Sequence, residues 1–374
     1  MKKSGHYGEN ELRERLSNIS GLNETAMQAA RARQARLAKP PRSLGRLEDI
    51  SIQLAGISGS VINEIRKKRL IVLCADNGVV REGVASAPQS VTKAQTINLT
   101  RGVTGAGALC AHFGAELQVV DVGVAEDIDC REVINRKLAY GTGNIAVEPA
   151  MSRETALLAI KVGMELSECA KRESVDIIGV GEMGIGNTTT SAAVLRALTG
   201  LPAEKLVGRG GGIDDKGFMR KIGIVSSCVQ RLEVDCADVI DVISKVGGLD
   251  IAAMCGVFLG AALCRLPVVI DGLISAAAAL CAYRLCPEAR DFMIPSHQSC
   301  EQGYAAAMRE LRLSPMLSLD MRLGEGSGCP IAFELVSAAC AVMSGMASFE
   351  GAGIDDGYLD EIRRNDSYTD GGAK

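Results

Sequence analysis

The sequence predicts an α/β protein built on a doubly wound, mostly parallel, Rossmann-like sheet. From about residue 69 onward, short continuous apolar runs end in polar or glycine-rich residues and then lead into alanine-rich segments of helical length. Continuous apolar runs are typical of strands covered on both faces, and intervening helices make the connections parallel. In such folds ligands bind outside the carboxyl ends of the strands. We therefore expect the polar segments to meet at one site.

Six apolar runs are the expected strands. In chain order they span residues 70–73, 117–120, 175–180, 267–270, 292–294 and 316–319. Several are followed by a carboxylate or an amide, as in Asp76-Asn77-Gly78, Gly181-Glu182 and Asp271-Gly272. Before the first strand, residues 24–38 and 44–57 show helical patterns, separated by Lys39-Pro40-Pro41, which would break a helix.

Composition favours a folded globular protein with a small-molecule ligand. The 374 residues are 47% hydrophobic and 23% charged, enough for a large core. The formal net charge is −4, from 41 basic and 45 acidic residues without a long basic block. Neither nucleic acid nor an anionic membrane is therefore an expected partner.

The cysteines and apolar segments indicate a cytoplasmic location. The 13 cysteines are scattered, and no pair has the two-residue spacing of zinc or redox sites, so we expect reduced thiols. There is no charged and apolar leader of the secretory type. The strongest membrane candidate, residues 251–263, is too short to span a bilayer and predicts a buried helix.

Glu325 is the leading candidate for a catalytic base. It stands alone between Gly324 and Gly326, in a segment that follows an apolar run and opens another. Glycine adopts backbone angles closed to other residues and lets a ligand approach the main chain. The alternative is that the glycines only shape a turn and Glu325 favours a helix N-terminus by its charge.

A glycine-rich loop, residues 179–190, predicts a phosphate site. It follows an apolar strand and precedes a helical run, so backbone N–H groups, with Asn187 and Thr188, could hold an anion without a metal. It lacks the ending of an ATP-binding P-loop. An ordinary capped strand-to-helix turn is the alternative.

Four other polar residues give weaker signals. Asp271 could accept hydrogen bonds from a ribose or cap the following helix. Lys221, taken alone, is a solvated lysine, and Gln95 could face the ligand or water, with water favoured by the pattern alone. For His297 a structural hydrogen bond is favoured over a metal, because no carboxylate or cysteine lies nearby at ligand spacing.

Taken together, these segments resemble the nicotinate-nucleotide:dimethylbenzimidazole phosphoribosyltransferase family, which builds the lower-ligand nucleotide of cobalamin. The resemblance covers nearly the whole chain, and the ordered set of markers is highly specific. The markers are residues 39–48 (KPPRSLGRLE), 75–79 (ADNGV), 141–145 (GTGNI), 181–189 (GEMGIGNTT), 245–248 (KVGG), 294–297 (IPSH) and 322–328 (RLGEGSG).

The resemblance implies a domain organisation and a set of site residues. Residues 1–62 with 330–374 would form a small helical domain, residues 63–329 a large α/β catalytic domain, and the protein a homodimer. Glu325 matches the catalytic glutamate, and no metal or other cofactor is expected. The implied substrate-binding residues are Gln95, Ala87, Glu182, Met183, Gly184, Gly186, Asn187, Thr188, Lys221, Asp271, Ser299 and Leu323.

The implied reaction moves phosphoribose from nicotinate mononucleotide to 5,6-dimethylbenzimidazole, giving an α-ribazole phosphate and nicotinate. Ala87 stands where some family members have a serine beside the base, so a purine or a phenol is an alternative acceptor. Relatives that use phenols work as heterodimers with a paralogue, so a heterodimer is an alternative to the homodimer. A third alternative is a catalytically silent nucleotide-binding partner subunit.

Overall fold

A computed structural model describes residues 8–360 of the chain. Its centre is a six-stranded, all-parallel sheet with the strand order β3-β2-β1-β4-β5-β6. This is the Rossmann order, in which the chain reverses its direction of winding between β1 and β4. The strands are β1 (Lys68–Ala75), β2 (Glu116–Gly123), β3 (Ile134–Asn135), β4 (Ile177–Met183), β5 (Val268–Ile270) and β6 (Met293–Pro295).

Five of the six predicted strands are confirmed, and one is wrong. Residues 316–319 form no strand; Leu317 makes only an isolated parallel bridge with His297. The run is not buried as a central strand would be, since Leu319 is 50% exposed. The structure instead adds β3, whose two exposed residues are too few to give a pattern.

Fourteen α-helices occur in the described part of the chain, and most connect or cover the strands. The expected helices at residues 24–38 and 44–57 are present as α2 and α3. The helices are α1 (Glu9–Leu16), α2 (Glu24–Arg36), α3 (Arg46–Ser58), α4 (Ser90–Thr100), α5 (Gly105–Phe113), α6 (Arg153–Arg172), α7 (Asn187–Thr199), α8 (Asp215–Arg231), α9 (Val239–Val246), α10 (Leu249–Leu263), α11 (Leu273–Leu285), α12 (Gln302–Leu311), α13 (Gly328–Gly345) and α14 (Phe349–Ala352). Short 3-10 turns are η1 (Gly78–Glu82), η2 (Ala203–Lys205), η3 (Pro287–Phe292) and η4 (Gly357–Leu359).

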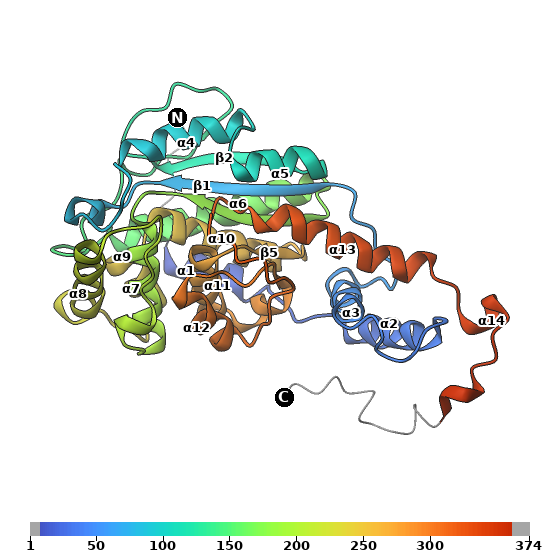
Figure 1. The fold of residues 1–374 in the computed structure, drawn as a ribbon. Helices are drawn as coiled ribbons and strands as arrows, with labels where there is room; N and C mark the ends of the chain where they lie inside the picture. Colours follow the sequence, from blue (N-terminus) through green and yellow to red (C-terminus); the bar gives the residue numbers. More distant parts are fainter. Residues whose placement is uncertain (1–7, 361–374) are drawn as a thin grey trace. The chain divides into compact units, whose positions relative to one another are not determined.

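Helices cover both faces of the sheet. Figure 1 shows α4 and α5 on one side of β1 and β2, and α10 and α11 on the other. Helix α10 is the predicted buried helix, and α6 packs against it through glycines. A Cβ on Gly163 would overlap the Ala253 carbonyl oxygen, and one on Gly256 would overlap that of Ile160. The two backbones thus approach as closely as only glycine allows.

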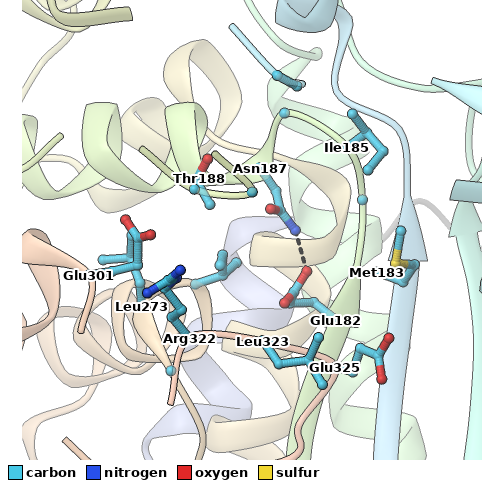
Figure 2. Close-up of a pocket in the computed structure, with 18 of the residues that line it drawn as sticks. Glu182, Met183, Ile185, Asn187, Thr188, Leu273, Glu301, Arg322, Leu323 and Glu325 are labelled. Atoms are coloured by element: carbon cyan, nitrogen blue, oxygen red, sulfur yellow. Dashed lines mark hydrogen bonds between the residues drawn. The ribbon is translucent and has the colours of Figure 1, made fainter. Parts of the chain in front are cut away.

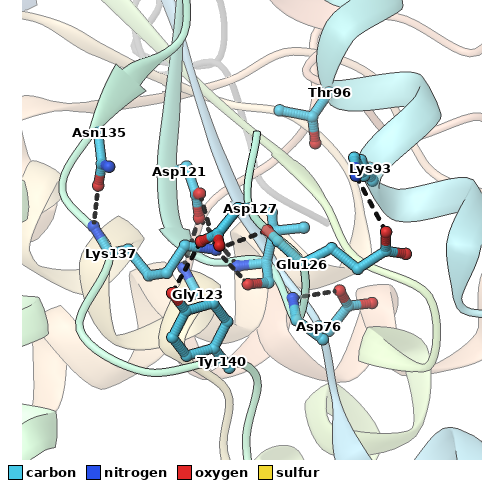
Figure 3. A network of polar contacts seen from close by, with 12 residues as sticks. Asp76, Lys93, Thr96, Asp121, Gly123, Glu126, Asp127, Asn135, Lys137 and Tyr140 are labelled. Carbon is cyan, nitrogen blue, oxygen red and sulfur yellow. Dashed lines mark hydrogen bonds and ion pairs between the residues drawn. The ribbon is translucent and has the colours of Figure 1, made fainter. Parts of the chain in front are cut away.

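A polar network joins the loops that follow β1 and β2 (Figure 3). Asp121 accepts the N–H groups of Gly123 at 3.0 Å and Val124 at 2.9 Å, and pairs with Lys137 Nζ at 3.0 Å. Asp76 accepts the N–H of Ala125 at 2.8 Å, and burial raises the pKa of its carboxyl. These contacts hold together the loops that follow β1 and β2.

The chain divides into two compact units. The first contains the sheet and runs through residues 67–332, together with α1. In the described residues, the second consists of 21–66 and 333–360, with a core of Ala26, Ala30, Leu37, Ala55 and Met343. The domain boundaries predicted from the sequence placed residues 1–62 in the small domain. The structure differs at the start, because α1 contacts α6 and α10 of the sheet unit.

One described helix passes a simple test for a membrane span. Helix α13 has 18 residues and a mean hydropathy of 1.5, and 50% of that window is buried inside the fold. From the sequence, residues 251–263 were the expected candidate instead. A core helix of a globular protein passes the same test by length and composition, so this one helix is weak evidence for a membrane.

Candidate active site

The polar segments that follow the strands meet in one cavity of about 260 Å³ (Figure 2). The loops after β4, β5 and β6, helix α4 and the turn at Glu325 all contribute to its wall. Twelve of the thirteen residues predicted for the site line it. They are Ala87, Gln95, Glu182, Met183, Gly184, Gly186, Asn187, Thr188, Asp271, Ser299, Leu323 and Glu325.

Glu325 lies on a strained turn that three consecutive left-handed residues form. The φ angles are +84° at Gly324, +60° at Glu325 and +80° at Gly326. A left-handed conformation costs a residue with a side chain roughly 1 kcal/mol or more, and such strain persists only where the surroundings enforce it. The glycines on both sides make this conformation accessible, as their pattern in the sequence indicated.

The turn packs directly on strand β4. A Cβ on Gly181 would lie 2.5 Å from the carbonyl oxygen of Glu325, and one on Gly326 would lie 2.5 Å from Leu70 Cδ1. Asp271 holds the turn from the other side, accepting the N–H of Gly326 at 3.2 Å and that of Gly328 at 2.7 Å. The position of Glu325 is thus fixed by backbone packing and by a buried carboxylate.

Both carboxylate oxygens of Glu325 have a donor nearby. Oε2 accepts the backbone N–H of Ala106 at 3.1 Å, in the first turn of α5. Oε1 lies 3.5 Å from Gln95 Nε2. Glu325 is buried at 6% exposure but reaches the cavity wall. The sequence did not predict helix α5 as part of the site. That helix is capped by Thr104, whose side chain accepts the N–H of Gly107.

Asp271 and His297 lie together beneath the turn. Burial raises the pKa of Asp271 to about 7, and the hydrogen bonds from Gly328 and Gly326 oppose that rise. The Nδ1 atom of His297 lies 3.1 Å from Ser296 Oγ, which is the structural hydrogen bond expected for this histidine. Burial lowers the pKa of His297, which favours the neutral ring. Asp271 therefore does not cap the helix that follows it, α11, which has no side-chain cap; it instead accepts amides of the Glu325 turn and of the start of α13.

Another buried carboxylate, Glu182, lies near the end of strand β4. Asn187 Nδ2 donates to Glu182 Oε2 and also to Asp250 Oδ2, the latter at 3.1 Å (Figure 2 draws the first contact). Burial and then the charge of Asp250 raise the pKa of Glu182 to about 8. Burial likewise raises the pKa of Asp250 to about 6. Near neutral pH this pair therefore holds a proton at Glu182.

The glycine-rich loop turns into helix α7 at the cavity. Gly186 is left-handed, with φ +97°, and no side chain caps the first N–H groups of the helix. The N–H groups of Asn187 and Thr189 donate to the carbonyl oxygens of Gly184 and Gly186 at 3.2 and 2.9 Å, so the helix dipole is the feature that favours an anion here. Thr188 lines the same wall, with Ser299 across from the loop after β6. Asn187, expected as a donor to the anion, instead donates its side-chain amide to Glu182 and Asp250, and the phosphate site stays a prediction.

Lys221 lies behind the cavity wall and does not line it. Its Nζ donates to Thr188 Oγ1 at 2.8 Å and to the Gly208 carbonyl at 3.1 Å. The residue is fully buried, so it is not the solvated lysine that its sequence context suggested. Burial lowers its pKa to about 8. Its direct contacts are thus with Thr188 of the glycine-rich loop and with the Gly208 carbonyl, and not with the cavity.

The opposite end of the cavity is mostly apolar. Met183 and Ala87 contribute to it, and Leu323 is 60% exposed there. A Cβ on Gly105 would overlap Leu323 Cδ2, so the missing side chain of Gly105 leaves room for that leucine. Gln95 lines the cavity, against the water-facing position that its pattern alone favoured. An aromatic ring fits this surface better than a second charged group does.

Three charged residues of the wall were not singled out from the sequence as ligands. Glu301, Arg209 and Arg322 line the cavity, and Arg209 also pairs with Asp215 at 2.5 Å. Their loops have neither helical nor strand periodicity, so the neighbouring glycines were the only feature of the sequence that pointed to these loops. Within residues 8–360, no group of three or more His, Cys, Asp or Glu side chains is arranged to hold a metal ion.

A Rossmann-order sheet with a cavity at the carboxyl ends of its strands is typical of enzymes that bind nucleotides, and the comparison with known families adds the reaction class. Residues 19–354 match a family model whose description is phosphoribosyltransferase.

Relatives carry a more specific name. A nicotinate-nucleotide-dimethylbenzimidazole phosphoribosyltransferase of Clostridium perfringens is 52% identical over 357 residues, covering 96% of this chain and 99% of the relative. A protein of the same name from Clostridium tetani is 45% identical over 353 residues, covering 94% and 98%. The crystal structure of CobT from Thermus thermophilus superposes with a TM-score of 0.86 at 38% identity, covering 89% of this chain and all of that one. The chain therefore belongs to the nicotinate-nucleotide:dimethylbenzimidazole phosphoribosyltransferase family, as its sequence markers predicted.

Proposed function

We propose that this chain transfers phosphoribose from nicotinate mononucleotide to dimethylbenzimidazole, releasing nicotinate. Relatives at 45% to 52% identity that span nearly the full chain carry the name of this activity. The observation that best supports it is the arrangement of the cavity. The start of α7 and a lone carboxylate on a strained turn line the same cavity, and its end away from α7 offers an apolar surface for a ring.

The start of α7 is proposed to hold the donor. The N-terminal end of α7, with Thr188 and Ser299, would bind the phosphate, while Lys221 supports Thr188 from behind. Fixing the phosphate brings the anomeric carbon of the ribose to a defined place, and orientation of this kind lowers the barrier substantially. The nicotinate ring already carries a pyridinium charge, so it leaves with the bonding electron pair and needs no strong acid.

Glu325 is proposed as the general base. The azole nitrogen of the acceptor attacks the anomeric carbon, the bond to the pyridinium nitrogen breaks, and Glu325 accepts the azole N–H proton. The hydrogen bond from Ala106 occupies Oε2, and Oε1 faces Gln95 and the cavity. General-base catalysis of this kind contributes about 100-fold to 10,000-fold.

Met183, Leu323 and Ala87 are proposed to contact the acceptor ring. They provide an apolar surface, and Ala87 removes the one hydroxyl that some family members place beside the base. The methyl groups of dimethylbenzimidazole suit this surface better than the exocyclic amine of a purine does. A phenol would also need a base, so Glu325 by itself does not distinguish it from an azole.

The test is product formation by the purified chain alone. It is incubated with nicotinate mononucleotide and, in separate reactions, dimethylbenzimidazole, adenine and phenol, and products are identified by mass. The expected result is nicotinate and an α-ribazole phosphate, with dimethylbenzimidazole preferred. Product from phenol alone would change the acceptor, and no product from any acceptor would favour a partner-dependent or silent subunit.

Glu325→Gln tests the base in the same assay. The variant should fold and bind the nucleotide, with turnover reduced at least about 100-fold. Glu204→Gln is the matched control, because Glu204 is an exposed carboxylate outside the cavity. Turnover of Glu325→Gln near that of the control would remove Glu325 from the role.

The assembly and location are also proposals. The family resemblance supports a homodimer in the cytoplasm, and a reducing compartment suits the 13 cysteines, all of which are free thiols in the structure. Light scattering of the purified chain reports the mass of the assembly directly.

A further inference from the structure

The side chains of two residues on helix α4 form a chain of hydrogen bonds that ends at Glu325. Gln95 and Asn98 are three residues apart, so they lie on one face of the helix. Asn98 Nδ2 donates to Gln95 Oε1 at 2.9 Å, and Gln95 Nε2 donates to Glu325 Oε1 at 3.5 Å. Gln95 lines the cavity, whereas Asn98 is a half-buried residue outside its wall.

The direction of this chain follows from its last member. An ionised carboxylate only accepts hydrogen bonds, so Gln95 must turn its NH2 group toward Glu325. Its carbonyl oxygen then faces Asn98, and Asn98 must donate to it. A carbonyl oxygen of Gln95 turned toward Glu325 would instead repel the charge. Asn98 thus opposes rotation of the Gln95 amide.

The second oxygen of Glu325 is fixed independently. The N–H of Ala106 holds Oε2 at the start of α5, where the helix dipole favours a negative charge. Helices α4 and α5 each contribute an amide to the carboxylate, and the Gln95 amide is the one that can rotate. Other titratable groups around the same cavity wall are Glu182 at the end of β4, Asp271 and His297 after β5 and β6, and Arg322 on the same segment as Glu325.

We infer that Asn98 is a positioning residue, which orients the Gln95 amide so that its N–H group, and not its carbonyl oxygen, faces Glu325 Oε1. This inference rests on the proposed function of Glu325 as a base. Replacing Asn98 by aspartate keeps the shape but leaves only acceptor atoms, so Gln95 must rotate and present its carbonyl oxygen to Glu325. The carboxylate should then stay protonated to higher pH.

The experiment compares pH profiles of kcat/KM in a double-mutant cycle. Asn98→Asp should move the acidic limb up by about one pH unit and lower turnover at neutral pH about tenfold. Ala94→Asp, which adds the same charge on the exposed side of α4, should leave the limb in place. In a Gln95→Leu background, Asn98→Asp should cause a smaller shift, because only the direct effect of the new charge on Glu325 remains. Thermal unfolding checks that each variant folds.

The outcomes separate this inference from the proposed function. Interdependent effects of the two substitutions, with an unshifted Ala94→Asp control, support the inference. Equal shifts with and without Gln95, or no shift in Asn98→Asp, overturn this inference. The proposed function would still stand, because the wild-type chain would form product and Glu325→Gln would still lose turnover. A wild-type chain that yields no product with any acceptor overturns both.

Discussion

Substituting Gly181 by alanine should inactivate the site without adding any group to the cavity. Gly181 lies in strand β4, and the atoms nearest to a new Cβ are backbone atoms of Glu325 and Gly326, at 2.5 to 2.7 Å. Ordinary van der Waals contact begins near 3.4 Å, so the turn must retreat by about 0.9 Å. Backbone atoms in a turn held by Asp271 cannot move aside as a side chain does.

A shift of this size is large for catalysis and modest for stability. Misplacing a reacting group by about 1 Å can cost on the order of 100-fold in rate. Overpacking at one position costs about 1 to 3 kcal/mol, which a folded domain with about 5 to 15 kcal/mol of stability survives. We therefore expect Gly181→Ala to fold, bind nicotinate mononucleotide and turn over about 100-fold more slowly.

The assay is steady-state turnover together with urea unfolding. Gly223→Ala is the matched control, because Gly223 lies in helix α8 with nothing within 4 Å of a new Cβ. That variant should keep its activity and gain up to about 1 kcal/mol from the better helix propensity of alanine. Turnover of Gly181→Ala within about threefold of wild type would refute the argument that the strand fixes the position of Glu325.

Three further variants test other parts of the site. Glu182→Gln should flatten the pH dependence of stability: the native pKa of Glu182 is raised to about 8 from 4.5, so the folded protein holds a proton that the unfolded chain releases. Between about pH 4.5 and 8, the free energy of unfolding of the wild type should therefore fall by a few kcal/mol more than that of the variant. Urea unfolding at several pH values measures this, and an equal dependence of stability on pH in the two proteins would contradict it. Lys221→Met removes the donor behind Thr188, so KM for the nucleotide should rise about tenfold with kcat little changed; a loss confined to kcat would argue against support of the phosphate loop. Gly105→Ala should displace Leu323 and raise KM for the aromatic acceptor alone, and an equal rise for the donor would show a wider disturbance.

The strands were predictable where burial dictated their composition. Both faces of β1, β4 and β5 are covered, so their residues are almost all apolar and the pattern is unambiguous. Residues 316–319 showed the same apolar run without the same surroundings, and the segment carries a single bridge to His297. An apolar run reports a preference for burial, and only pairing partners decide whether it becomes a strand.

Residues of the site were predictable where a residue type is rare in its setting. A glutamate between glycines and a glycine-rich loop before a helix both stand out in a sequence, and both line the cavity. Asp250 carries the same kind of signal, as the one charged residue of an otherwise apolar helix, but it was not predicted. Ala106 gave no signal, because it acts through its backbone N–H, which every residue except proline possesses.

By itself, the sequence determined the parallel α/β architecture, the family and the turn that carries Glu325, because these depend on apolar periodicity and on where glycine occurs. Only the tertiary structure decided which atoms surround that carboxylate. It placed Gly181 beneath the turn, the amide of Ala106 against Oε2, and Lys221 behind Thr188. Such contacts join residues far apart in the chain, and their energies depend on distances of a few ångströms that a one-dimensional pattern does not contain.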